Sequence, residues 1–282
     1  MTTPSRCPPR LRRIAPFSYG GAALLLAAAA CARVPAASTP APTPSRAPAA
    51  PAITTGRDLL RAMHERYAST WYHTVTFAQQ TTITLGSGGA LVQHWLEAGK
   101  IPGRLRIDTD TATQSGVLYA GDSLYRFSSG RMVASDTGRN DLLILGFDVY
   151  GQPVDSTVAV LAREGYDLSS LHRDSWQGVP VYVVGAAAGD TTTKQFWVEQ
   201  DRLLFVRLLE PQRAASGTHH NDIRFLKYVA HGGGWVAEEV MFYADGKPRV
   251  HEEYSSVRVD VPLSDAQFDP RQWSTATPWY RP

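Results

Sequence analysis

The stretch that decides the fold covers residues 72–108 and reads YHTVTFAQQTTITLGSGGALVQHWLEAGKIPGRLRID. Most of the bulky apolar residues between His73 and Leu85 stand at odd-numbered positions. The residues at the even-numbered positions between them are small or polar. This period of two is typical of a β-strand with one buried face. The glycine-rich residues 86–89 predict a tight reversal, and residues 90–98 predict the returning strand of an antiparallel hairpin.

The returning strand alternates as well, because Val92 and Leu96 stand out of phase with Gln93 and Glu97. This phase predicts that Val92 and Leu96 occupy its apolar face. A break at 100–103, which contains a proline and a glycine, is followed at 104–108 by alternating charged and apolar residues. The three segments together predict the start of a curved antiparallel sheet with one apolar face.

The first 30 residues have the composition of a bacterial export signal. Four arginines and no acidic residue precede Cys31, and residues 20–30 form an apolar run that is shorter than the ~20 residues of a membrane-spanning helix. The run ends in AAAC at 28–31, which resembles a lipobox, where a peptidase cuts and the cysteine receives diacylglycerol and an acyl chain such as palmitate. An ordinary signal peptide that is cut nearby is the alternative.

A mature chain that begins at Cys31 has no second thiol, because Cys7 lies in the removed segment. We therefore expect Cys31 to carry a lipid anchor and not to form a disulfide. Loss of the four arginines changes the formal net charge from +2 to −2, so the charge balance indicates no nucleic-acid partner. Residues 31–52 are rich in proline and alanine and predict a disordered tether, and residues 53–282 predict a single folded domain.

The pattern of the folded part predicts an α+β protein that is mainly β. Helices are expected at 55–68, 142–147 and 154–164, the first with Thr54 or Thr55 as its cap and Thr55 and Asp58 as a capping box. About a dozen strands and three helices in one chain predict a strongly curved antiparallel sheet with the helices against its concave side. Beyond the opening three strands, the strands are expected at 116–119, 123–127, 131–134, 179–185, 194–199, 202–210, 221–229, 235–243 and 249–259.

Several phrases of the sequence resemble the bacterial lipoprotein-sorting family of the soluble carrier LolA and its outer-membrane receptor LolB. The predicted helix and hairpin are followed by KxPGRxRxD at 100–108 and by GVLYAGDSLY at 116–125. Later phrases similar to sorting proteins are GGGW at 232–235, YADGK at 243–247 and FDPxxW at 268–273. The resemblance covers about 55–273 and implies a half-open β-barrel, helices that act as a lid, and an apolar cavity for acyl chains.

Apolar and aromatic residues of the predicted strands are the candidates for the wall of such a cavity. For each residue alone, the alternative is an ordinary packed core. A cavity requires a sheet that is too strongly curved for the helices to fill. The candidates are Val75, Phe77, Ile83, Trp95, Leu105, Ile107, Phe196, Val198, Phe205, Phe225 and Phe242.

Other residues are candidates for the cavity mouth or its lid. Lys100, Arg104 and Arg106 could hold a lid carbonyl or a lipid headgroup, and the alternative for the arginines is a solvated face. Residues 142–147, with Leu143 and Phe147, are either a movable plug or a fixed core helix.

Motifs for catalysis are missing from the sequence. It has no GxSxG elbow, no glycine-rich phosphate loop, no HExxH helix and no pair of mature thiols, so we expect neither an enzyme, nor catalytic residues, nor a cofactor. The nearest approach to a metal cluster is His219-His220 with Asp222, and the next is 251–253. Adjacent strand residues point to opposite faces, so we interpret both as solvated strand ends and expect no metal site.

These observations predict a membrane-anchored, non-enzymatic binder of acyl chains or lipidated proteins that functions in lipoprotein sorting or transfer. It would face the periplasm as a monomer, with an envelope protein as a further partner. In the resembling system, Ala32 after the anchor cysteine implies delivery to the outer membrane. Two alternatives stay open: an envelope stress sensor or assembly protein that holds a polypeptide, and a hydrolase whose site the motifs miss.

Overall fold

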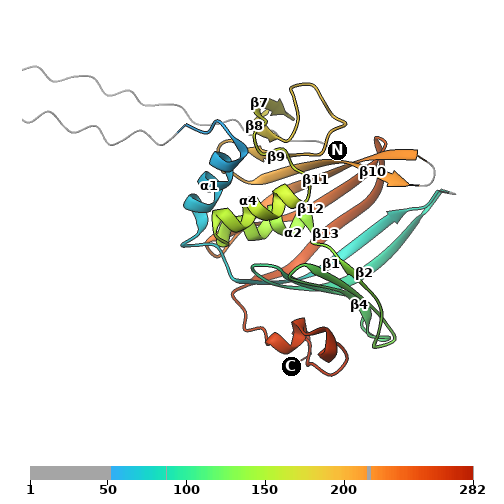
Figure 1. Cartoon of the computed structure of the whole chain (residues 1–282). Coiled ribbons are helices and arrows are strands. Elements are labelled where there is room, and N and C mark those ends of the chain that lie inside the picture. The colour runs from blue at the N-terminus through green and yellow to red at the C-terminus, as the bar shows by residue number, and fades with distance from the viewer. Residues whose placement is uncertain (1–51, 87, 215–216, 282) are drawn as a thin grey trace, which may run out of the picture. The chain divides into compact units, whose positions relative to one another are not determined.

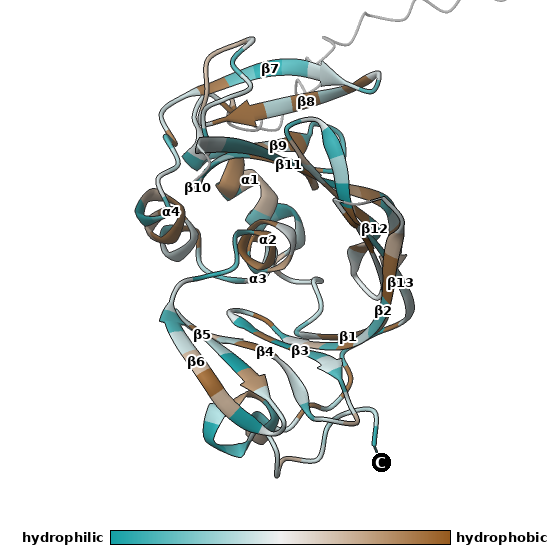
Figure 2. Ribbon diagram, turned by 90° about the vertical axis from the view of Figure 1, so that its right-hand side faces the viewer, coloured by the Kyte–Doolittle hydropathy of each residue, from teal (hydrophilic) through white to brown (hydrophobic). Residues whose placement is uncertain are grey.

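The first strand of the folded part pairs with the last one and thereby joins two meanders into a single sheet. In the computed structural model, which describes residues 52–86, 88–214 and 217–281, β1 (Thr74–Thr84) runs antiparallel to β13 (Lys247–Val259). The thirteen strands have the order β6-β5-β4-β3-β2-β1-β13-β12-β11-β10-β9-β8-β7. The sheet therefore has the edges β6 and β7, and Figure 2 shows that it curves strongly between them.

Apart from β7, the other strands correspond to predicted ones, and Figure 1 shows their course through the domain. They are β2 (Ala90–Lys100), β3 (Arg104–Asp110), β4 (Ser115–Ala120), β5 (Ser123–Ser128), β6 (Arg131–Thr137), β7 (Leu171–Trp176), β8 (Val179–Val184), β9 (Gln195–Glu199), β10 (Phe205–Ala214), β11 (Gly217–His231) and β12 (Gly234–Ala244). The helices are α1 (Gly56–Tyr67), α2 (Asp141–Leu143), the π-helix η1 (Ile144–Asp148), α3 (Val149–Gly151), α4 (Val154–Arg163) and the 3-10 helices η2 (Asp265–Phe268) and η3 (Pro270–Gln272).

The predicted fold class is confirmed: an unclosed, curved antiparallel sheet carries helices on its concave side. The sequence prediction missed β7, because its residues LHRDSW lack the alternation of a half-buried strand. It also missed η2 and η3, whose residues are few and carry no periodic signal.

The helices that follow β6 connect the two edges of the sheet. Because β6 and β7 lie at opposite ends of the strand order, the segment from α2 to α4 must cross from one edge to the other. Figure 2 shows this segment and α1 inside the curve of the sheet. Among the described residues, no helix has the length and apolar character needed to cross a membrane.

Helix α1 begins with the predicted capping box. The Thr55 hydroxyl accepts a hydrogen bond from the backbone N–H of Asp58, and an Asp58 carboxylate oxygen accepts one from the backbone N–H of Thr55. The apolar stripe of the helix, which includes Leu59, Leu60 and Met63, is buried. Since this stripe faces the sheet, α1 fills part of the concave side.

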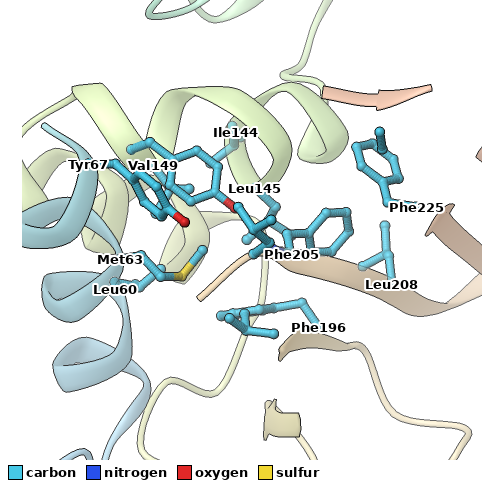
Figure 3. Close-up of a cluster of buried hydrophobic side chains, with 14 of the residues drawn as sticks. Leu60, Met63, Tyr67, Ile144, Leu145, Val149, Phe196, Phe205, Leu208 and Phe225 are labelled. Atoms are coloured by element: carbon cyan, nitrogen blue, oxygen red, sulfur yellow. The ribbon is translucent and has the colours of Figure 1, made fainter. Parts of the chain in front are cut away.

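The filled part of the concave side lies over β8 to β12. Figure 3 shows Leu60 and Met63 of α1 gathered with Leu145 of the second helical segment and Phe205 of β10. Ring contacts extend this packing, with Trp71 stacked on Tyr150 at a centroid distance of 3.9 Å. This region is a packed core with fully buried side chains and supplies much of the apolar burial that holds the helices on the sheet.

The C-terminal segment packs on the opposite, convex face of β3 to β5. Trp273 stacks on Phe127 with ring centroids 4.2 Å apart, and the guanidinium of Arg106 lies 3.9 Å from the centre of the Trp273 ring. Arg106 also makes two hydrogen bonds of 2.9 Å to the carboxylate of Asp108, and both side chains are buried. Trp273 therefore covers a buried ion pair, and disrupting a buried ion pair lowers the stability of a protein strongly.

Replacing Trp273 by alanine should destabilise the domain by about 3–5 kcal/mol, because it removes a buried aromatic ring and exposes one side of the Arg106–Asp108 pair. Urea unfolding followed by circular dichroism measures this loss. Trp279→Ala, at a position only half-buried, serves as the control and should cost clearly less. Equal costs for the two variants would contradict the role assigned to Trp273.

Candidate functional site

A cavity of about 500 Å³ lies on the part of the concave face that the helices leave uncovered. Its wall comes from β1 to β4 on one side, from β10 to β13 on the other, and from the helical segment that follows β6. Fourteen of the 24 residues that line it are apolar or aromatic, which suits a hydrocarbon chain, and the others are mostly polar or charged. The apolar and aromatic lining consists of Val75, Phe77, Trp95, Leu105, Ile107, Tyr119, Leu142, Leu143, Phe147, Leu208, Ile223, Phe225, Phe242 and Tyr254.

The structure divides the predicted wall residues into two groups. Seven of them line the cavity: Val75, Phe77, Trp95, Leu105, Ile107, Phe225 and Phe242. Phe196, Val198 and Phe205 face the same concave side, but they are fully buried in the packed core beneath the helices. Ile83 lies near the tip of the first hairpin, where it pairs with Leu91 and Val250, and does not reach the cavity.

Lys100, Arg104 and Arg106 are not at the cavity mouth, and that prediction is corrected here. Arg104 and Arg106 alternate with Leu105 and Ile107, and since the apolar pair lines the cavity, the arginines project from the convex face. There Lys100 and Arg104 each lie 2.6 Å from the Asp265 carboxylate, and Arg106 is covered by Trp273.

On β2 the structure agrees with the prediction for Trp95 but not with the one that placed Val92 and Leu96 on the apolar face. Trp95 and Glu97 face the cavity, whereas Val92 is exposed and Leu96 lies on the other face. The reason is the register of the hairpin, which sets Glu97 opposite Phe77 and Trp95 opposite Gln79. Directly opposed residues of an antiparallel pair share one face, so the inward face of β1 fixes that of β2.

The helical segment after β6 forms one wall of the cavity through Leu142, Leu143 and Phe147. The Asn140 side chain caps its start by accepting hydrogen bonds from the backbone N–H groups of Leu142 and Leu143, at 2.9 and 3.2 Å. At Gly146 a β-carbon would lie 2.7 Å from the Phe225 ring, so only glycine permits this approach of η1 to β11. The predicted plug is therefore both a cavity wall and part of the core.

Ion pairs hold the start of this segment on both sides. Arg139 pairs with Asp122 in the turn between β4 and β5, and the hydrogen bond from Arg139 holds the pKa of Asp122 below its ordinary value. Asp141 pairs with Lys194, which precedes β9, at 2.7 Å. Because these partners lie in the two separate halves of the sheet, the pairs tie the segment across the concave side.

Asp148 fixes the end of η1 to the turn between β2 and β3. Its Oδ1 accepts a hydrogen bond of 3.0 Å from the backbone N–H of Gly103, and its Oδ2 is buried without a partner among the described residues. Burial raises the pKa of Asp148 to about 7. The neutral acid is therefore favoured in the folded state.

This raised pKa predicts a pH dependence of stability. Unfolded Asp148 has an ordinary pKa near ~3.9, so the folded state binds the extra proton between about pH 4 and 7, and stability falls as the pH rises through this window. The free energy of unfolding of the wild type should fall between pH 5 and pH 8. In Asp148→Asn this fall should be smaller by about 2–3 kcal/mol.

Urea unfolding at the two pH values measures the effect. Asp155→Asn is the matched control, because Asp155 is an exposed carboxylate that pairs only with Arg57 among the described residues. A pH dependence unchanged by Asp148→Asn would contradict the assignment.

A polar patch interrupts the apolar wall and was missed by the sequence analysis. It consists of Glu97 on β2 and of Glu252 and Tyr254 on β13, all of which line the cavity. The Tyr254 hydroxyl donates a hydrogen bond of 2.9 Å to Glu252, and the Tyr254 ring stacks on Phe77 at 4.4 Å. Burial raises the pKa of Glu252 to about 7, and burial together with the Glu252 charge raises that of Glu97 well above its ordinary value.

The two histidine clusters are distributed over separate ion pairs. His219 contacts the Asp245 carboxylate at 2.7 Å, whereas Asp222 pairs with Arg207 and Arg224. His251 contacts Glu239 at 2.9 Å. Within the described ranges, no three His, Cys, Asp or Glu side chains come together in a way that could hold a metal ion.

The geometry defines a class of protein: a half-open β-barrel with helices on its concave side and an apolar hollow that remains between them. No protein-family model matches the sequence, and no curated protein sequence matches it. Solved structures do match. A candidate outer membrane lipoprotein-sorting protein domain from Vibrio parahaemolyticus superposes with a TM-score of 0.52 at 8% identity, over 78% of this chain and 98% of that chain.

Two further solved structures match with lower scores. A LolA superfamily protein from Nitrosomonas europaea has a TM-score of 0.46 at 15% identity, over 77% of this chain and 98% of that chain. A DUF1329 family protein from Desulfovibrio piger has a TM-score of 0.48 at 15% identity, over 76% and 95%. The match to the Vibrio domain shows that the chain shares the fold of that domain, an open and curved antiparallel sheet with helices on its concave side.

Proposed function

We propose that this domain binds an acyl chain, free or attached to a lipidated protein, in its concave cavity and passes it on without covalent chemistry. The observation that carries the proposal is the apolar cavity of about 500 Å³ between the sheet and the α2–η1 segment. The LolA-like fold supports it, since the Vibrio domain of the same fold is a candidate lipoprotein-sorting protein.

Hydrophobic burial would supply the affinity. Each methylene that leaves water contributes about 0.8 kcal/mol, and association itself costs at least ~4 kcal/mol. A single chain in a cavity of this size is therefore held reversibly, which is what a protein that receives and releases its ligand requires.

The proposed place of action is the cell envelope, on the periplasmic face of the outer membrane. The supporting features are the export signal at 1–30 and Cys31, both of which lie outside the described residues, as does most of the tether at 31–52. A lipid on Cys31 would keep the domain at the membrane while the tether gives it reach.

Neutral alkanols of increasing length should bind with an affinity that rises about fourfold per methylene until the cavity is full, because 0.8 kcal/mol corresponds to that factor. Leu105→Trp should abolish this rise, since the larger ring occupies the cavity. Displacement of a fluorescent fatty probe measures the affinities, and native mass spectrometry identifies any chain that co-purifies.

Leu91→Trp makes the same substitution at an exposed position of β2 outside the cavity and should behave as the wild type. If no alkyl probe binds and the domain instead captures a polypeptide, the protein is a sensor or assembly factor. Turnover of an acyl ester would establish a hydrolase and end the proposal.

Cys31→Ala should move the protein from the membrane fraction to the soluble fraction, because the proposed diacylglycerol and acyl chain would be lost. Fractionation of cells that express each form measures the distribution. Cys7→Ala leaves the anchor position intact and serves as the control. Unchanged membrane association of Cys31→Ala would refute the anchor.

A further inference from the structure

The polar patch of Glu97, Glu252 and Tyr254 lies in the cavity wall, and a cavity that binds only hydrocarbon does not require it. Glu97 is only 5% exposed, and no described residue donates a hydrogen bond to its carboxyl group. Gln79, on the same face of β1 and between Trp95 and Tyr254 in the sheet, has its Oε1 buried without a partner. Buried acceptors without donors are costly, so a ligand that brings a donor would be favoured here.

The register of the sheet brings the two carboxyl groups to opposite sides of β1. Glu97 of β2 stands opposite Phe77, and Glu252 of β13 stands opposite Thr81. Both side chains line the cavity, and the Tyr254 hydroxyl between them donates a hydrogen bond of 2.9 Å to Glu252. Two acids therefore face the same cavity from the two strands that flank β1.

Apart from the side chains that form ion pairs, the charged residues that line the cavity are all acidic. Its two basic side chains are both engaged, Arg139 with Asp122 and Lys194 with Asp141. Glu97, Glu252, Glu164 and Glu210 also line it, and within the described ranges none of these four pairs with a basic group. The uncompensated charge that a ligand meets is therefore negative.

We propose that Glu97 and Glu252 form a subsite for a cationic nitrogen, so that the ligand of the cavity is an amphiphile with an ammonium group on an apolar chain. This inference rests on the proposed function, because the apolar wall must hold the chain. An ammonium group supplies the donor that Glu97 lacks and neutralises carboxylates in a site of low polarity. A fatty-acid anion in the same position would face like charges and is disfavoured.

Binding of the cation is linked to loss of protons from the two carboxyl groups. Their raised pKa values mean that protons are displaced when an ammonium group enters, so affinity for the cation increases with pH. The titratable groups that face the two acids are Tyr119 of β4 and Tyr254 of β13, which stay neutral because burial raises their pKa values. The other charged residues that line the cavity are Arg139, Asp141, Glu164, Lys194 and Glu210. Of these, the two basic residues, Arg139 and Lys194, are both engaged in ion pairs.

Three probes with the same twelve-carbon chain test the inference: dodecylammonium, dodecanol and laurate. Competition against a neutral fluorescent probe at pH 6.0 and 8.5 measures their affinities, and calorimetry in buffers of different ionisation enthalpy measures proton release. We expect dodecylammonium to bind at least about tenfold more tightly than laurate at pH 8.5, with a smaller ratio at pH 6.0.

Glu97→Gln and Glu252→Gln should each reduce the preference for the cation and the proton release, while dodecanol binds as in the wild type. Glu253→Gln is the matched control, because Glu253 neighbours Glu252 but is exposed on the outer face of β13. Circular dichroism establishes that each variant is folded.

The outcomes separate the two proposals. Equal binding of the three probes, or a preference that survives both glutamine variants, overturns the cationic subsite and leaves the acyl-binding cavity in place. Failure of all three probes to bind overturns both.

Discussion

The pairing of β1 with β13 is the constraint on which the rest of the structure depends. It joins the strands on either side of the helical segment into one sheet and leaves β6 and β7 as its two edges. Those edges are consecutive in the chain, so the residues between them have to cross the concave side. The helices of this connection lie inside the curve because the chain has to pass from β6 to β7. Their apolar side chains pack on the sheet and hold them there.

A short helical segment that spans a strongly curved sheet cannot cover all of it. Over β8 to β12, α1 and Leu145 meet Phe205 and the space is filled. Over β1 to β4 and the adjoining parts of β10 to β13, a cavity remains between the strands and the helical side chains of Leu142, Leu143 and Phe147. The filled half supplies stability and the open half supplies a binding surface, so a single architecture provides for both.

The sequence was sufficient for twelve of the thirteen strands and for part of the cavity wall. Period-two alternation identified the inward faces of β1 and β3, and thereby Phe77 and Leu105, without any tertiary information. It could not separate Phe205 from Phe77, since which part of the concave face the helices cover is decided by their packing and not by either strand.

The remaining errors have specific causes. Arg106 was assigned to the mouth although its alternation with Leu105 places it on the outer face, where the distant Trp273 covers it. Glu97 and Glu252 do not stand out in the sequence, because a polar residue in a strand is by default expected on the outer face. A glutamate in phase with Trp95, and another in phase with Tyr254, were signals that could have identified the polar patch.

The central claim is that the hollow beside Phe77 and Phe225 stays open in the folded protein and accepts a hydrocarbon chain. A crystal of the domain grown with 12-bromododecanol, and measured at the bromine absorption edge, tests this claim most directly. The anomalous peak should lie inside the cavity, between β1 and the α2–η1 segment. A bromine found only on the outer surface, or a concave side closed by repacked side chains, would contradict the account.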